Sequence, residues 1–333
     1  MARLKDVAEA AGVSVRTVSN VVNNYAYVHP DTRSRVQAAI EEMGYRPNLA
    51  ARNLRRGRTG MIGLAVPDLT VPYFAELAQH VLKAVAASGL TLLIEQTDGE
   101  LDREIAFACT PQANALDGLL LSPLSARASD LTPDRASIPI VLLGERIFDS
   151  PFDHVAIDNV AAARAATLHL ANLGRERVAA IGVGTDIDSP MADLRQRGYG
   201  MAVEEGGLSR DPRLVAPTTS FSRAEGYRAA TVLLDSGADA DALFCFNDLL
   251  AQGALRALSE RGIAVPGAVA VIGMDDNDED QYLTPSLSSI SPDKEDLARR
   301  AVARLLARIN GDRTSLGVEE RPRFTLVARE SAP

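Results

Sequence analysis

The sequence predicts an α/β protein in which a small three-helix head and a hinge helix precede a two-lobed core of parallel sheets. Charge and periodicity both indicate this division. The first 58 residues hold 10 Lys and Arg against 5 Asp and Glu, whereas the other 275 hold 25 against 39. From residue 61, short apolar runs alternate with amphipathic segments, which is typical of parallel sheets covered by helices. We therefore place the head at 1–47, the hinge at 48–59 and the core at 60–333.

Two short helices joined by a tight turn are predicted for residues 4–24. Ala8 is small where the helices would touch, Gly12 permits a positive φ at the corner, and Val18 returns to the shared core. Ser14 would cap the second helix by accepting a hydrogen bond from a backbone N–H near Thr17. The spacing is typical of a DNA-binding helix-turn-helix, although an ordinary helical hairpin fits it about equally well.

Outward side chains of the second helix favour the DNA-binding interpretation. Val15, Arg16 and Asn20 project from its first turns, where a recognition helix meets base edges in the major groove. Arginine can bond guanine, asparagine can bond adenine, and valine can touch a thymine methyl, each bidentate contact contributing ~1–3 kcal/mol of discrimination. The short polar side chains expected on phosphate oxygens are Ser14, Thr17, Ser19, Asn23 and Thr32.

A third helix is expected from Pro30, which suits a first helical position, to Gly44. Its apolar face would consist of Val36, Ala39, Ile40 and Met43. Three helices make a minimal DNA-binding unit, and its positive charge would attract the phosphate backbone through counterion release.

The basic segment 48–58 is too short to hold a core of its own. A flexible linker is one interpretation, because a short isolated helix is marginal in water. The other is a hinge helix in the minor groove, with arginines on phosphates and a leucine wedge. The residues that would meet the groove are Ala51, Leu54 and Arg55.

The core repeats strand and helix patterns twice, which predicts two lobes. We expect strands at 61–67, 90–95, 117–123 and 138–144, and, after the pattern restarts beyond 154–158, at 178–184, 242–247 and 268–274. Helices are expected at 73–87, 101–113, 160–173, 194–205, 224–234 and 248–261. The segments 287–290, 294–309 and 323–329 could cross back, giving one lobe of about 60–159 and 291–321 and another of about 160–290 and 322–333.

Polar residues follow the predicted strands at the edge where open parallel sheets bind ligands. They are Asp68, Ser122, Arg146, Asn247, Asp248 and Asp275, joined by Tyr73, Phe74, Arg195 and Phe221. Carboxylates, amide and guanidinium beside aromatic rings suit a small polyhydroxylated molecule, so a sugar is the first hypothesis. Alternatively, Asp248 and Asp275 could cap helices and Phe221 could belong to the core.

Other classes of protein are less well supported. No apolar run reaches 18 residues and the start MARLKDVAEA is charged, so we expect a cytoplasmic protein without a membrane span. Cys109 and Cys245 are too few and too far apart for a disulfide framework, and the four histidines show no metal-ligand spacing. The GVG at 182–184 lacks the third glycine of a dinucleotide site, and the acidic run 275–280 lacks the glycine and glutamate of a calcium loop. We therefore expect no enzyme activity, cofactor or metal.

The chain resembles the LacI/GalR family of bacterial transcriptional repressors over essentially its full length. The resemblance lies in LKDVAEAAGVSVRTVSNVVN, GYRPNLAARNLRRGRTGMIG, VPDLTVPYFAEL, VAIDN, LRQRGY, FNDLLAQGAL, VIGMDD and LVARES. It implies a homodimer whose heads read an inverted-repeat operator, hinge helices that fold on DNA with Leu54 at the centre, and a periplasmic-binding-protein-like core that closes on an effector. It also implies effector contacts from Asp68, Phe74, Arg195, Phe221, Asn247 and Asp275.

Departures from the family pattern narrow the expected function. Asn20 stands where many members carry Arg or His, so the operator half-site is not transferable. The loop 185–189 offers two aspartates where purine-binding members tend to offer arginine, and the chain ends without a heptad tail, which favours a dimer. We expect a repressor of carbohydrate-utilisation genes under allosteric control by a sugar-like effector. The alternatives are a regulator that responds to a nucleoside, purine or other metabolite, and a solute-binding protein, which would have no use for residues 1–58.

Overall fold

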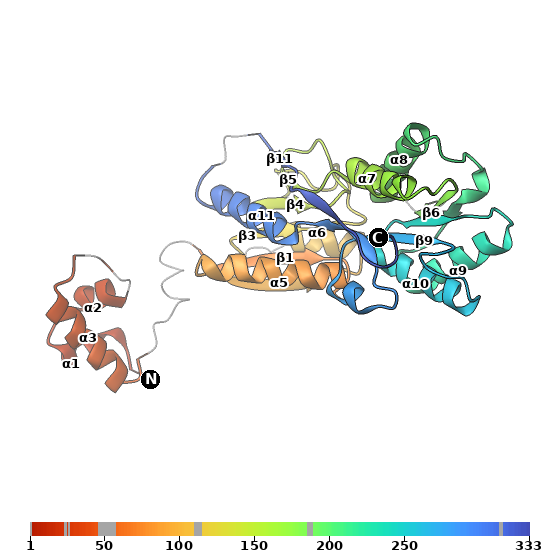
Figure 1. The fold of residues 1–333 in the computed structure, drawn as a ribbon. Helices are drawn as coiled ribbons and strands as arrows, with labels where there is room; N and C mark the ends of the chain where they lie inside the picture. Colours follow the sequence, from red (N-terminus) through yellow and green to blue (C-terminus); the bar gives the residue numbers. More distant parts are fainter. Residues whose placement is uncertain are drawn as a thin grey trace. The chain divides into compact units, whose positions relative to one another are not determined.

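A computed structural model of the chain describes residues 2–22, 25, 27–45, 58–109, 115–184, 189–312 and 316–333. The chain divides into two compact units, Met1–Gly60 and Met61–Pro333 (Figure 1). Most of the predicted hinge, residues 48–57, lies outside the described residues. No helix in the described ranges is long and apolar enough to cross a membrane.

The first unit contains the helices α1 (Leu4–Ala11), α2 (Val15–Val22) and α3 (Pro30–Glu42). Gly12 ends α1 with a φ of 63°, a left-handed conformation that glycine adopts without a Cβ penalty. The three helices enclose a small core of Val7, Ala8, Ala11, Val18, Val21, Val36 and Ala39. The predicted three-helix head is therefore confirmed.

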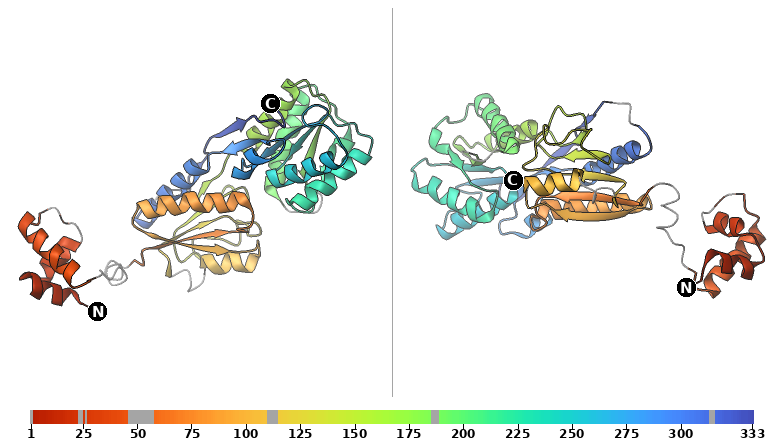
Figure 2. Two further views of the ribbon diagram at one scale, coloured as in Figure 1. Left: turned by 60° about the horizontal axis from the view of Figure 1, so that its bottom comes forward. Right: turned by 180° about the vertical axis from the view of Figure 1, so that it is seen from behind.

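The first lobe of the second unit is built on a parallel sheet. Its strands are β1 (Met61–Val66), β2 (Thr91–Gln96), β3 (Gly118–Leu121), β4 (Ile140–Leu143), β5 (Asp153–Val155) and β11 (Glu319–Glu320), in the order β11-β5-β4-β3-β1-β2. The helices α5 (Pro72–Ala87) and α11 (Lys294–Ile309) share one apolar core with this sheet and lie side by side (Figure 2). Residue Ala108 of α6 (Leu101–Cys109) belongs to the core on the other face.

The second lobe is also built on a sheet of parallel strands, except that one strand runs in the opposite direction. Its strands are β6 (Val178–Val183), β7 (Val215–Pro217), β8 (Ala242–Cys245), β9 (Ala270–Met274), β10 (Ser288–Pro292) and β12 (Phe324–Val327), in the order β12-β10-β9-β8-β6-β7. Only β12 pairs in the antiparallel sense among these described strands. The surrounding helices are α7 (Asn159–Asn172), α8 (Pro190–Glu205), α9 (Arg223–Asp235) and α10 (Asp248–Glu260).

Differences from the sequence prediction concern short elements and helix ends. The strands β7 and β11 were not predicted, because VAP and EE are too short to show a periodicity. The helix α8 begins four residues before the predicted position, since the Ser189 hydroxyl accepts a hydrogen bond from the backbone N–H of Ala192. The described part of α6 ends at Cys109, and the predicted extension to 113 lies outside the described residues.

Close packing of α9 on α10 depends on two glycines. A Cβ on Gly253 would lie 2.0 Å from the Arg223 carbonyl oxygen, and one on Gly226 would lie 2.1 Å from the Leu250 carbonyl oxygen. Gly253→Ala should therefore lower the free energy of unfolding by about 3 kcal/mol, as measured by urea denaturation. Gly200→Ala in α8 is the control, because a Cβ there meets nothing within 4 Å and should raise stability by up to about 1 kcal/mol. Equal stabilities of the two variants would contradict this packing.

Candidate functional site

The exposed face of α2 carries the residues predicted to read bases. Val18 and Val21 are buried in the head, so the helix turns its other side outward. Val15 is 44% exposed, Arg16 is exposed, and Asn20 is half-buried. The arrangement leaves a guanidinium, an amide and an apolar side chain available on one short helix.

The start of α2 is capped as the sequence predicts. The Ser14 hydroxyl accepts a hydrogen bond from the Thr17 backbone N–H at 3.1 Å and lies 2.9 Å from the Thr17 hydroxyl. Ser14 is exposed, whereas Thr17, Ser19 and Thr32 are half-buried. The remaining residues predicted to contact DNA, namely Asn23, Ala51, Leu54 and Arg55, lie outside the described residues.

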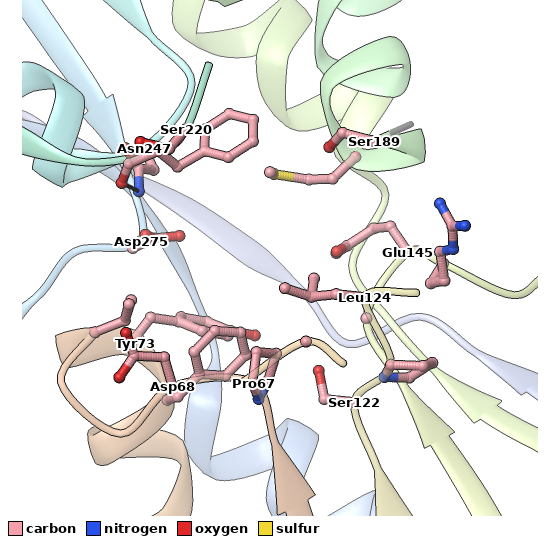
Figure 3. A pocket seen from close by; sticks show the side chains of 18 of the residues that line it. Pro67, Asp68, Tyr73, Ser122, Leu124, Glu145, Ser189, Ser220, Asn247 and Asp275 are labelled. Carbon is pink, nitrogen blue, oxygen red and sulfur yellow. Dashed lines mark hydrogen bonds between the residues drawn. The ribbon is translucent and has the colours of Figure 1, made fainter. Parts of the chain in front are cut away.

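A cavity of about 1340 Å³ lies between the two lobes of the second unit. The carboxyl ends of parallel strands of both sheets open onto it, and side chains from both lobes point into it (Figure 3). Of the residues predicted to meet an effector, those that line the cavity are Asp68, Ser122, Tyr73, Phe74, Arg146, Arg195, Phe221, Asn247 and Asp275.

Asp248 does not line the cavity, so its predicted ligand contact is wrong. It is fully buried at the start of α10, where its carboxylate accepts hydrogen bonds from the Ser289 hydroxyl at 2.7 Å and the Asn277 backbone N–H at 3.2 Å. Successive residues after a strand point in different directions, and here Asn247 faces the cavity while Asp248 faces inward. Asp248 fastens the loop that follows β9 and thereby supports Asp275.

Arg195 is held in the cavity wall by two acceptors. Its Nε donates to Asn159 Oδ1 at 2.8 Å, and its guanidinium also donates to the Phe246 carbonyl oxygen. Asn159 in turn donates from Nδ2 to Glu145 Oε1 at 2.7 Å. Because only 5% of Arg195 is exposed, its orientation is fixed before any ligand arrives.

Glu145 is a cavity residue that the sequence analysis missed. It follows β4 directly before Arg146, so the rule that selected Arg146 applies to it equally. Through Asn159 it connects the first lobe to Arg195 of the second lobe. A carboxylate at this position adds an acceptor to the cavity and orients the amide that holds the arginine.

Asp275 occupies an unusual position directly after β9. Its φ is 136°, and 7% of the residue is exposed. Its carboxylate makes no hydrogen bond with any of the described residues, although Arg195 and Lys294 act on it electrostatically. Burial raises the pKa of Asp275 to about 7, with the arginine and lysine opposing that rise. A ligand hydroxyl would supply the missing hydrogen bond.

Aromatic and amide groups complete the cavity. The rings of Tyr73 and Phe74 contact edge to face, with centroids 5.3 Å apart. Burial raises the pKa of Tyr73, and the nearby carboxylates Glu145 and Asp275 raise it further, so its hydroxyl stays protonated. The Asn247 amide is partly engaged, since it caps α10 at the Leu250 N–H and donates to the Phe221 carbonyl oxygen.

Asp68 is oriented by its own loop. The Thr70 backbone N–H and hydroxyl both donate to Asp68 Oδ1 at 2.8 Å. Its second oxygen makes no hydrogen bond within the described part of the chain. The cavity therefore combines a fixed guanidinium with incompletely bonded carboxylates and aromatic rings, groups that can donate to and accept from several hydroxyl groups at once.

Comparison with known proteins matches both units. The family model for bacterial regulatory proteins of the lacI family matches residues 3–48, and that for a periplasmic binding protein-like domain matches residues 167–332. The transcriptional repressor PurR of Serratia proteamaculans is 33% identical over 99% of this chain and 97% of its own. A putative LacI-family regulator from Sanguibacter keddieii is 44% identical over 83% of this chain and 99% of its own, with a TM-score of 0.76. The regulator CelR in complex with cellobiose is 32% identical over 99% and 100%, with a TM-score of 0.71.

The raised pKa of Asp275 predicts a pH-dependent stability. The folded chain keeps this proton up to about pH 7, whereas an unfolded carboxyl loses it near its ordinary pKa of 3.8. The contribution of this group to the free energy of unfolding therefore falls as pH rises from about 4 to 7. Asp275→Asn should become progressively more stable relative to wild type across that window, as measured by urea denaturation at pH 4.5, 6 and 8. A difference that does not change with pH would contradict the raised pKa.

Proposed function

This chain belongs to the lacI family of bacterial regulatory proteins, and from this we propose that it represses carbohydrate-utilisation genes. In this proposal it acts as a homodimer on an inverted-repeat operator, and a sugar-like effector controls its affinity for that operator. The family consists of DNA-binding transcriptional regulators and not of enzymes. The cavity between the lobes, with Arg195 fixed in its wall, is the observation that carries the effector part of the proposal.

The surface of α2 supports reading of the operator. Val15 and Arg16 are exposed at the N-terminal end of α2, which is the end that a recognition helix places in the major groove. Asn20 follows one turn later. The hydroxyls of Ser14, Thr17, Ser19 and Thr32 would bond phosphates and set the register. Contacts from Asn23, and from Ala51, Leu54 and Arg55 of the hinge, remain predictions from the sequence.

An exposed apolar surface supports the homodimer. Leu93 and Ile94 are exposed on β2, which is the edge strand of the first sheet, and Leu82 is exposed on the neighbouring α5. Exposed apolar side chains beside an unpaired strand edge are typical of a surface covered by another chain. A second copy of this chain would pair two heads, as an inverted repeat requires.

Two measurements on operator DNA test the reading of bases by α2 and the assembly of two chains into a homodimer. Arg16→Ala should relax the base preference at one position of each half-site in a selection from randomised operators, because a bidentate contact is lost. Arg35→Ala, on the exposed surface of α3, is the control and should keep the preference. Analytical ultracentrifugation of the wild-type complex should give two chains per operator. An unchanged preference in Arg16→Ala, or one chain per operator, would contradict the proposal.

The composition of the cavity supports a sugar as effector. Fixed donors and free carboxylate oxygens can bond neighbouring hydroxyls while Tyr73 and Phe74 offer aromatic faces. A relative of nearly the same length, CelR, is described in complex with cellobiose. Binding between the lobes would favour one lobe arrangement, and the differential affinity, typically 1–3 kcal/mol, would change the affinity for DNA.

Removal of Arg195 tests the effector site. Sugars, and nucleosides as the alternative class, are titrated while operator binding is measured by fluorescence anisotropy. Wild type should respond to at least one sugar. Arg195→Ala should need an at least about tenfold higher sugar concentration for half of that response, because a fixed donor to the ligand is lost. Arg197→Ala, an exposed arginine on the same helix, should respond as wild type does. If Arg195→Ala responds normally, the effector binds elsewhere, and a response to nucleosides alone would overturn the sugar assignment.

A further inference from the structure

The cavity extends across four neighbouring strands of the first sheet. Its lining includes Glu145 after β4, Ser122 after β3, Asp68 after β1 and Gly99 after β2. Adjacent strands lie about 4.8 Å apart, so these four strand ends span about 14 Å. This length exceeds the breadth of a single pyranose ring.

The second sheet lines the cavity over a similar length. Asp275 follows β9, Asn247 follows β8, and Phe221 follows β7, with β6 between the last two. The ionisable groups Arg195, Asp275 and Glu145 gather toward the β4 and β9 side. A ligand bound to them alone would leave the β2 and β7 side of the cavity empty.

Two exposed leucines, Leu101 and Leu124, line that remaining part of the cavity, and we call them the leucine shelf. Leu124, in the loop after β3, is 53% exposed, and Leu101, at the start of α6, is 39% exposed. Figure 3 shows the Leu124 side chain pointing into the cavity. A Cβ on Gly99 would lie 3.2 Å from Leu124 Cδ1, so Leu124 extends over the loop that follows β2.

The leucine shelf is held in place by a buried carboxylate. Glu104 of α6 is fully buried, and its oxygens accept hydrogen bonds from the backbone N–H groups of Leu124 and Ala126, both at 2.7 Å, and of Ser125 at 3.2 Å. The Ser125 hydroxyl donates to the Gly99 carbonyl oxygen at 2.5 Å. The loop after β3 is thereby fastened to α6 and to the loop after β2, which fixes the shelf before a ligand binds.

Building on the sugar-responsive function proposed above, we propose that the effector is a saccharide of at least two rings. The first ring binds among Arg195, Asn247 and Asp275, and the second lays its C–H face on the leucine shelf. Apolar side chains that stay exposed inside a cavity gain from covering by such a face. A monosaccharide reaches only the charged part and leaves Leu101 and Leu124 exposed.

The test measures binding of matched sugars to the full chain by isothermal titration calorimetry. The probes are glucose, mannose and xylose beside cellobiose, maltose, mannobiose and xylobiose. At least one disaccharide should bind about tenfold tighter than the monosaccharide of which it consists. Leu124→Ser should remove most of that advantage and leave monosaccharide binding within about twofold, and Leu101→Ser should act in the same direction.

Controls separate the leucine shelf from general effects on folding. Leu173→Ser alters a leucine outside the cavity whose exposed fraction, 37%, is close to the 39% of Leu101, and it should keep both affinities. Leu124→Met should keep the disaccharide advantage, and thermal unfolding of each variant should show an intact fold. Equal affinities for mono- and disaccharides, or an equal loss for both in Leu124→Ser, would overturn the two-ring effector. If a monosaccharide then still alters operator binding, the sugar-responsive function stands, whereas no response to any sugar overturns both.

Discussion

The parallel arrangement of strands is the constraint on which the ligand cavity depends. Parallel strands all end at the same edge of a sheet, so each sheet delivers its loops to one side. The two sheets turn these edges toward each other, and residues as distant in sequence as Asp68 and Asp275 line one cavity. The cavity wall is consequently made of short loops whose backbones are fixed by buried strands. Specificity can then change by substitution in the loops without loss of either core.

Electrostatics in this cavity are balanced by a small number of fixed contacts. Arg195 is oriented by Asn159 and by a backbone carbonyl, and Glu145 orients Asn159 from the other lobe. Asp275 remains without a hydrogen bond from the described residues, and its burial raises its pKa to about 7. The cavity therefore holds one ordered cation and one incompletely satisfied acid. Both groups belong to the second lobe, so a ligand that bonds them and also bonds Asp68 or Glu145 of the first lobe will depend on the relative position of the two lobes, which is what an allosteric effector requires.

Much of this arrangement was predictable from the sequence, because periodicity identifies strands and the residues after them. Asp68, Arg195, Asn247 and Asp275 follow from that rule together with the family resemblance, and all four line the cavity. Asp248 shows a limit of this rule, because the sequence does not tell which of the two adjacent polar residues Asn247 and Asp248 faces the cavity and which faces the core. Leu124 shows another, because an apolar residue after a strand looks like part of a core until its exposed fraction is known. The support from Glu104 depends on contacts between distant segments that no local pattern encodes.

The last strands of the chain determine when each part of the protein can fold during synthesis. The head is a contiguous segment with its own core and can fold as soon as it leaves the ribosome. Neither lobe has this freedom, because β11 completes the first sheet and β12 pairs with β10 in the second. Both sheets therefore lack a strand until residues 319–327 have been translated. A nascent chain would carry a finished DNA-binding head attached to two incomplete lobes, and neither lobe can be completed before residues 319–327 have left the ribosome.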